Sequence, residues 1–81
     1  VLVNLNSTIG HDATLGDWTS LSAQCDITGH VRVADRVFMG SRASIIPEKS
    51  VGSRSIVGAG AVVVTHVPAD VTVVGIPARI L

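Results

Sequence analysis

The chain has 81 residues, 47% of them hydrophobic, with six basic and six acidic side chains. This length allows one domain with a small core, and the balanced charge argues against a nucleic-acid partner or an anionic membrane surface. No apolar run reaches the roughly 18 residues of a membrane span, so the hydrophobic excess predicts burial against other copies of the chain or against further sequence.

A hydrophobic residue recurs at every sixth position from Val3 onward. The series contains only aliphatic residues and methionine: Val3, Ile9, Leu15, Leu21, Ile27, Val33, Met39, Ile45, Val51, Val57 and Val63. We number the six places of each repeat from these residues, which gives eleven hexads between Val3 and Pro68. The fifth places hold small or β-branched residues, with Lys49 as the exception, and five of the eight glycines occupy second places.

A period of six fits neither an α-helix nor a simple alternating strand, but it fits short strands joined at corners. Residues at the first and fifth places share a parity, so both can point inward. The second-place glycines indicate a positive φ or a close backbone approach. With three hexads to a triangular turn, the sequence predicts an all-β parallel β-helix of about three to four coils, whose hand the repeat alone does not determine.

The hexad phase is expected to break at residues 67–70, because Pro68 has no N–H for a further ladder hydrogen bond. Residues 71–74 predict one more short strand, and residues 75–79 turn away from it, so that 69–81 form a terminal strand and tail. The amino-terminal end has no comparable cap, and an open solenoid end exposes a strand edge. We therefore expect residues 1–81 to be a single β-helix domain that is the C-terminal part of a longer chain.

The strongest candidate for chemistry is His11, at a third place that should face outward near a corner. An imidazole can accept a proton near neutral pH, and the neighbouring Asp12 carboxylate could orient the ring or raise its basicity. From the spacing alone, a solvent-exposed histidine beside a turn aspartate is the favoured interpretation, because such pairs are common.

Several other polar or reactive residues have structural explanations. Cys25 is the only cysteine and falls at an inward fifth place, which predicts a buried core thiol and a reducing compartment, the cytoplasm. Trp18 is expected at a subunit interface. Lys49 predicts a local bulge that lets its ammonium reach solvent. His30 and His66 would lie two coils apart, about 10 Å, which is too far to share one metal ion, so no metal is expected.

Five segments of the chain carry a family resemblance. They are Val3–Asp12, Ile27–Val31, Met39–Ser41, Val57–Ala61 and Val73–Arg79. In these segments the chain resembles the hexapeptide-repeat acyltransferases. It is most similar to bacterial nucleotide-amino-sugar N-acetyltransferases of the bacillosamine type and to sialic acid O-acetyltransferases. The resemblance implies a left-handed prism, acetyl-CoA as co-substrate, a small sugar acceptor, and a homotrimer whose active sites lie between neighbouring prisms.

The resemblance also implies roles for individual residues. His11 matches the general base, Asp12 its acidic supporter, and Gly29 the residue whose N–H binds the thioester carbonyl. Ser20 departs from the family pattern, because part of the family has a histidine there. The positions implied along the acetyl-CoA groove are Ser20, Gly29, Ser41 and Ala59, and Asn4 is implied as a polar contact for the acceptor.

Three functions follow as hypotheses. The first is an acetyltransferase in which a sugar amine or hydroxyl attacks acetyl-CoA directly, with His11 as the base. The second is a non-catalytic trimerisation or scaffold module, which the repeat alone supports equally well, since fold does not determine function. The third, a metal-dependent lyase, would need a metal, and the spacing of the three histidines does not match the histidine ligands of related prism-shaped enzymes.

Overall fold

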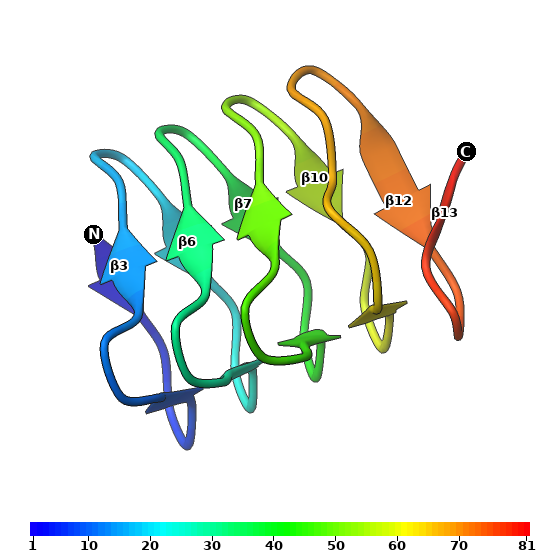
Figure 1. Ribbon diagram of the computed structural model, residues 1–81. Coiled ribbons are helices and arrows are strands. Elements are labelled where there is room, and N and C mark those ends of the chain that lie inside the picture. The colour runs from blue at the N-terminus through cyan, green and yellow to red at the C-terminus, as the bar shows by residue number, and fades with distance from the viewer.

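The computed structural model describes residues 1–81 as a coiled stack of short strands (Figure 1). No helix is present that could span a membrane. The thirteen strands are β1 (Leu2–Val3), β2 (Thr8–Ile9), β3 (Thr14–Leu15), β4 (Ser20–Leu21), β5 (Asp26–Ile27), β6 (Arg32–Val33), β7 (Phe38–Met39), β8 (Ser44–Ile45), β9 (Ser50–Val51), β10 (Ile56–Val57), β11 (Val62–Val63), β12 (Thr72–Val74) and β13 (Arg79–Ile80).

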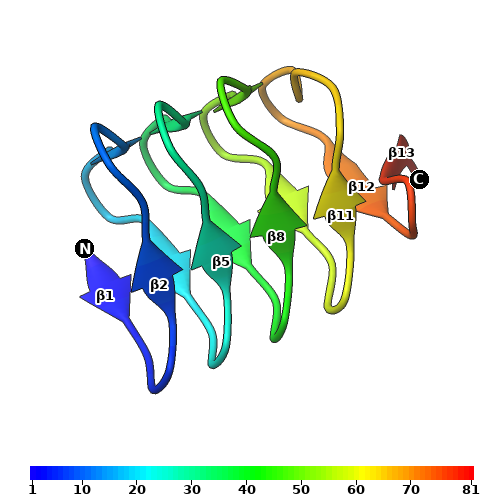
Figure 2. The ribbon, with the colours of Figure 1, turned by 60° about the horizontal axis from the view of Figure 1, so that its bottom comes forward.

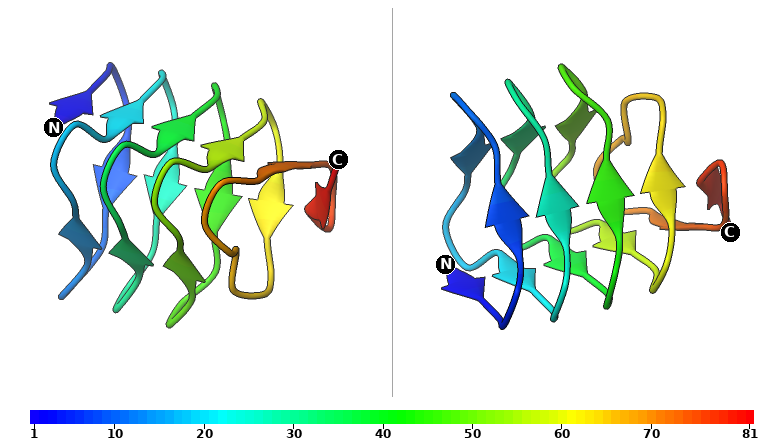
Figure 3. Two further views of the ribbon diagram at one scale, coloured as in Figure 1. Left: turned by 90° about the horizontal axis from the view of Figure 1, so that it is seen from above. Right: turned by 90° about the horizontal axis from the view of Figure 1, so that it is seen from below.

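Three sheets form the sides of a prism (Figures 2 and 3). The first sheet has the order β1-β4-β7-β10-β12-β13, the second β2-β5-β8-β11, and the third β3-β6-β9. Strands of successive coils pair in parallel, and their partners are 18 residues apart, as in Leu2 with Ser20 and Thr8 with Asp26. One coil is therefore three hexads, and the predicted left-handed parallel β-helix of about three to four coils is confirmed, with about four coils present.

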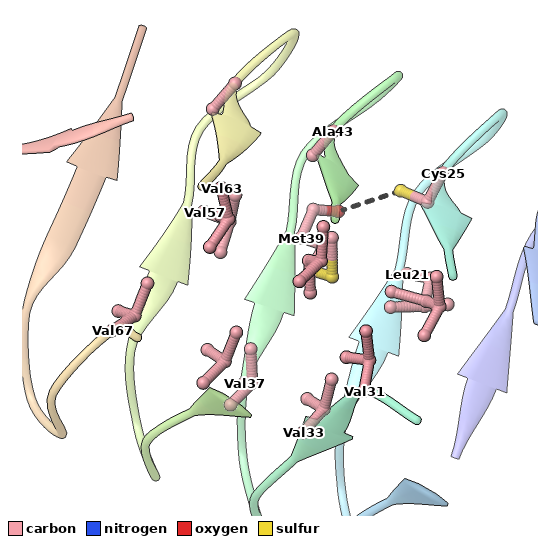
Figure 4. Packing of buried hydrophobic residues seen from close by; sticks show 14 of the residues in the cluster. Leu21, Cys25, Val31, Val33, Val37, Met39, Ala43, Val57, Val63 and Val67 are labelled. Atoms are coloured by element: carbon pink, nitrogen blue, oxygen red, sulfur yellow. Dashed lines mark hydrogen bonds between the residues drawn. The ribbon is translucent and has the colours of Figure 1, made fainter. Parts of the chain in front are cut away.

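First- and fifth-place side chains fill the inside of the prism (Figure 4). Cys25 is one of them, with its Sγ 3.2 Å from the carbonyl oxygen of Gly40, and burial raises the pKa of its thiol. The prediction of a buried core thiol is confirmed. Val3 and Ile9 remain 41% and 43% exposed, although they occupy first places, because the first coil has a neighbour on one side only.

The corners depend on the fourth place of the hexad, which has positive φ in ten successive repeats. The residues are Asn6, Asp12, Trp18, Gln24, His30, Arg36, Arg42, Glu48, Arg54 and Gly60. The second-place glycines do not have positive φ; they allow close approach between coils. A Cβ at Gly52 would lie 2.4 Å from the backbone nitrogen of Ala69, and one at Gly10 would lie 2.5 Å from a backbone carbon of Thr28.

The hexad phase breaks earlier than predicted. Val63 pairs with Ile45 at the regular spacing of 18, whereas Val67 pairs with Val51 at a spacing of 16. The corner between residues 63 and 67 is thus two residues short. At the regular spacing of 18, Val67 would stack on Lys49 in the next coil. Because Val67 pairs with Val51 instead, the Lys49 side chain is only partly buried. The prediction of a bulge at Lys49 was wrong, because the carbonyl oxygen of Lys49 still accepts the ladder hydrogen bond from the N–H of Arg32 at 3.0 Å.

The C-terminal strand expected at residues 71–74 is β12, which pairs with β10. The tail was expected to turn away from the prism, but it stays against it. It turns at Gly75, whose φ is +96°, and returns as β13, antiparallel to β12 with Val73 opposite Ile80 (Figure 1). The final segment therefore covers the last coil of the first sheet.

Candidate active site

Four candidate residues lie at the corner that joins the second sheet to the third. His11 and Asp12 connect β2 to β3, and Gly29 and His30 connect β5 to β6 in the next coil. The 18-residue period places Gly29 beside His11 and His30 beside Asp12. The two corners are held together by a hydrogen bond of 2.8 Å from the N–H of His30 to the carbonyl oxygen of His11.

The Asp12 carboxylate lies between two imidazoles. Its Oδ2 is 3.1 Å from Nε2 of His11 and 3.9 Å from Nδ1 of His30. The two rings meet edge to face, with centroids 5.8 Å apart and planes at 85°. The side chains of His11, Asp12 and His30 are 84%, 61% and 57% exposed, so a ligand can reach all three within a single chain.

The backbone N–H of Gly29 donates no hydrogen bond within the chain, although its carbonyl oxygen accepts one of 3.1 Å from the N–H of Glu48. Its φ lies outside the left-handed region, and a Cβ there would make only an ordinary contact of 3.5 Å with the carbonyl oxygen of His11. One coil further on, Pro47 occupies the equivalent place without an N–H of its own. The free N–H of Gly29 can thus donate to a ligand beside His11.

Ser41 and Ala59 lie at a different corner, between the first sheet and the second. They are stacked one coil apart, with the N–H of Gly60 donating to the carbonyl oxygen of Ser41 at 2.8 Å. The strands of the second sheet separate this corner from that of His11 (Figure 2). Within one chain, these two residues do not meet the histidine corner.

The remaining two predicted residues also lie away from His11. Ser20 is in β4, between Leu2 and Phe38 of the neighbouring strands of the first sheet. Asn4 follows β1, and its Nδ2 donates a hydrogen bond of 2.9 Å to the carbonyl oxygen of Leu21. The structure therefore groups His11, Asp12 and Gly29 but not the other predicted site residues.

His30 is the residue of this corner that sequence reasoning missed, because it was compared with His66 rather than with Asp12. The signal that identifies it is the interval of 18 residues, one full coil, between Asp12 and His30. His66 lies in the shortened corner, where its Nδ1 is 3.0 Å from the donating N–H of Ser50. No group of three or more His, Cys, Asp or Glu side chains is arranged to hold a metal ion.

The chain is similar to acetyltransferases both in sequence and in structure, although no family model matches it. PerB from Caulobacter crescentus, solved with CoA and GDP-perosamine, is 38% identical with a TM-score of 0.96 over 99% of this chain and 40% of that one. The acetyltransferase domain of PglB from Neisseria gonorrhoeae, solved with acetyl coenzyme A, is 33% identical with a TM-score of 0.95 over 98% of this chain and 40% of that one. In sequence and in fold the chain is therefore similar to the hexapeptide-repeat acyltransferases.

A curated member of these acyltransferases, the serine acetyltransferase of Buchnera aphidicola, is 37% identical over all of this chain. The chain spans 28% of that relative and 40% of PerB, so it corresponds to less than half of either protein. The similarity to PerB and PglB confirms the resemblance to bacterial amino-sugar N-acetyltransferases of this hexapeptide-repeat family.

Proposed function

We propose that this chain is the catalytic β-helix of an acetyl-CoA-dependent acetyltransferase that acts on a sugar amine or hydroxyl, with a nucleotide-activated amino sugar as the favoured acceptor. The observation that carries the proposal is the corner where the His11–Asp12 pair stacks one coil from Gly29, whose N–H donates no hydrogen bond within the chain. A general base and a preorganised donor for the oxyanion are the two elements that direct acyl transfer needs.

In the proposed reaction, His11 takes a proton from the acceptor as its nitrogen or oxygen attacks the thioester carbon. The N–H of Gly29 stabilises the negative charge that develops on the carbonyl oxygen. The C–S bond then breaks, and the proton held by His11 passes to the departing thiolate of CoA. Asp12 supports the charged imidazole. No covalent enzyme intermediate is required.

We also propose that acetyl-CoA runs past Ser20, Ser41 and Ala59 of a neighbouring protomer in a homotrimer. Their separation from His11 within one chain supports this arrangement. Exposed Leu2 and Phe38 on the first sheet supply apolar surface for another copy to bury.

Two finer points complete the proposal. Because Asn4, like Ser20, lies away from His11 of its own chain, its Oδ1 would contact an acceptor bound at His11 of a neighbouring protomer, while its Nδ2 donates to Leu21. The cytoplasm, which supplies acetyl-CoA and keeps Cys25 reduced, is the proposed location.

The test is release of free CoA thiol from acetyl-CoA with a panel of acceptors: nucleotide-linked amino sugars, sialic acid and L-serine. L-serine is included because serine acetyltransferases are among the relatives. We expect release that depends on a nucleotide-linked amino sugar. Release with L-serine alone would overturn the sugar assignment, and a trimeric protein that releases no thiol with any acceptor would support the scaffold function instead.

A further inference from the structure

His30 is held in a fixed relation to the proposed base. Its N–H donates to the carbonyl oxygen of His11 at 2.8 Å, and its ring meets the ring of His11 edge to face at a centroid distance of 5.8 Å. Its Nδ1 lies 3.9 Å from the same carboxylate oxygen of Asp12 that lies 3.1 Å from Nε2 of His11. The sequence resemblance assigns no role to this histidine.

An exposed carboxylate beside a single exposed imidazole is weakly ordered. Such pairs contribute about 0–1 kcal/mol, because solvent screens the charges and side-chain entropy opposes a fixed geometry. Asp12 is 61% exposed and lies at a corner, so His11 alone holds it poorly. A second imidazole with its Nδ1 3.9 Å from Oδ2 limits the rotamers of the carboxylate, and its edge-to-face contact limits those of His11.

We propose that His30 is a positioning residue that acts through Asp12 to hold the His11 ring in its productive orientation. This inference rests on the proposed function. In physical terms, the corner contains a three-residue unit spanning two coils, and the 18-residue period of the β-helix keeps its members in register.

Two variants separate the contributions of the nitrogen and the ring of His30. His30→Phe keeps an aromatic ring and removes Nδ1. A large aromatic residue is compatible with this place of the hexad, because Trp18, two hexads earlier, occupies it with φ of 62°. His30→Asn keeps a polar nitrogen near the position of Nδ1, and asparagine accepts the positive φ of this corner readily. Both are expected to melt near the wild-type temperature.

We expect His30→Phe to lower kcat about tenfold, less than the roughly 10²-fold cost of a full 1 Å misplacement, with KM for acetyl-CoA changed less than about twofold. His30→Asn should recover most of kcat. In an Asp12→Asn background, His30→Phe should cause no further loss, because the two residues act as one unit.

A kcat for His30→Phe equal to that of the wild type, or a loss that simply adds to that of Asp12→Asn, would overturn the inference. Modification of His11 by diethylpyrocarbonate provides a readout independent of turnover, and it should become faster in His30→Phe. A protein that is inactive with every acceptor contradicts the proposed function itself. A protein inactivated by His11→Asn but untouched by His30→Phe contradicts only the role of His30.

Discussion

Replacement of Gly29 by proline should remove the proposed oxyanion donor without disturbing the fold. The N–H of Gly29 has no acceptor within the chain, so its loss breaks no internal hydrogen bond. Pro47 already occupies the equivalent place one coil later, which shows that this corner accommodates proline. Proline also reduces the entropy of the unfolded chain, by about 0.4–1 kcal/mol at compatible sites. The variant should therefore be at least as stable as the wild type.

The expected loss is confined to the chemical step. Removal of one oxyanion donor costs about 10²–10³ in kcat, or about 2.7–4 kcal/mol of transition-state stabilisation. Gly29→Ala and Gly29→Val are the matched controls, because both keep the N–H and valine adds bulk similar to that of the proline ring. A Cβ at this position has room, at 3.5 Å from the carbonyl oxygen of His11.

Steady-state release of CoA thiol with the best acceptor provides the assay, and thermal melting provides the control for folding. We expect only the proline variant to lose kcat. If Gly29→Pro melts normally and keeps kcat within about threefold of the alanine variant, the N–H of Gly29 does not stabilise the oxyanion and the reasoning is refuted.

Three further predictions concern the fold. Gly52→Ala should lower the free energy of unfolding by about 1–3 kcal/mol, because its Cβ would lie 2.4 Å from backbone, whereas Gly29→Ala should not; equal melting temperatures for the two would contradict the close-approach explanation. The hydrogen bond from Arg54 lowers the pKa of Asp70, so its stabilisation is present above the ordinary carboxyl pKa and is lost as the pH falls below about 4. Asp70→Asn should flatten the acid limb of a melting-temperature profile, and an unchanged limb would argue against this pair. Cys25 should react with a thiol reagent only on unfolding, and rapid reaction in the native protein would contradict its burial.

Most of the fold could be predicted from the sequence because three hexads of the repeat make one coil. Aliphatic residues at every sixth position specify both the inward face and the 18-residue register. The corner conformation could not be predicted, because the fourth places hold residues as different as Asn6, Trp18 and Arg36, and their positive φ follows from the coil geometry. The early phase break was missed because valine is common at both the first and the fifth place, so the sequence did not show that Val67, counted as a fifth-place residue, pairs with first-place Val51.

The proposed site could be predicted only in part. His11 and Asp12 were candidates from their residue types, the resemblance gave their roles and added Gly29, and the 18-residue period accounts for the proximity of the three. His30 was overlooked because its neighbour in space, Asp12, is one coil away in sequence. The residues proposed to contact acetyl-CoA lie at another corner and in another sheet, so their relation to His11 depends on contacts between protomers rather than within one chain.

The central claim, that the corner of His11 performs acyl transfer, is tested most directly by comparing His11→Asn with His66→Asn in the thiol-release assay. Both variants replace a histidine at a corner between the second and third sheets, and only His11 lies beside Asp12 and Gly29. The account predicts that His11→Asn lowers acceptor-dependent kcat by about 10²-fold or more while His66→Asn leaves it nearly unchanged. Equal activity of the two variants would contradict it.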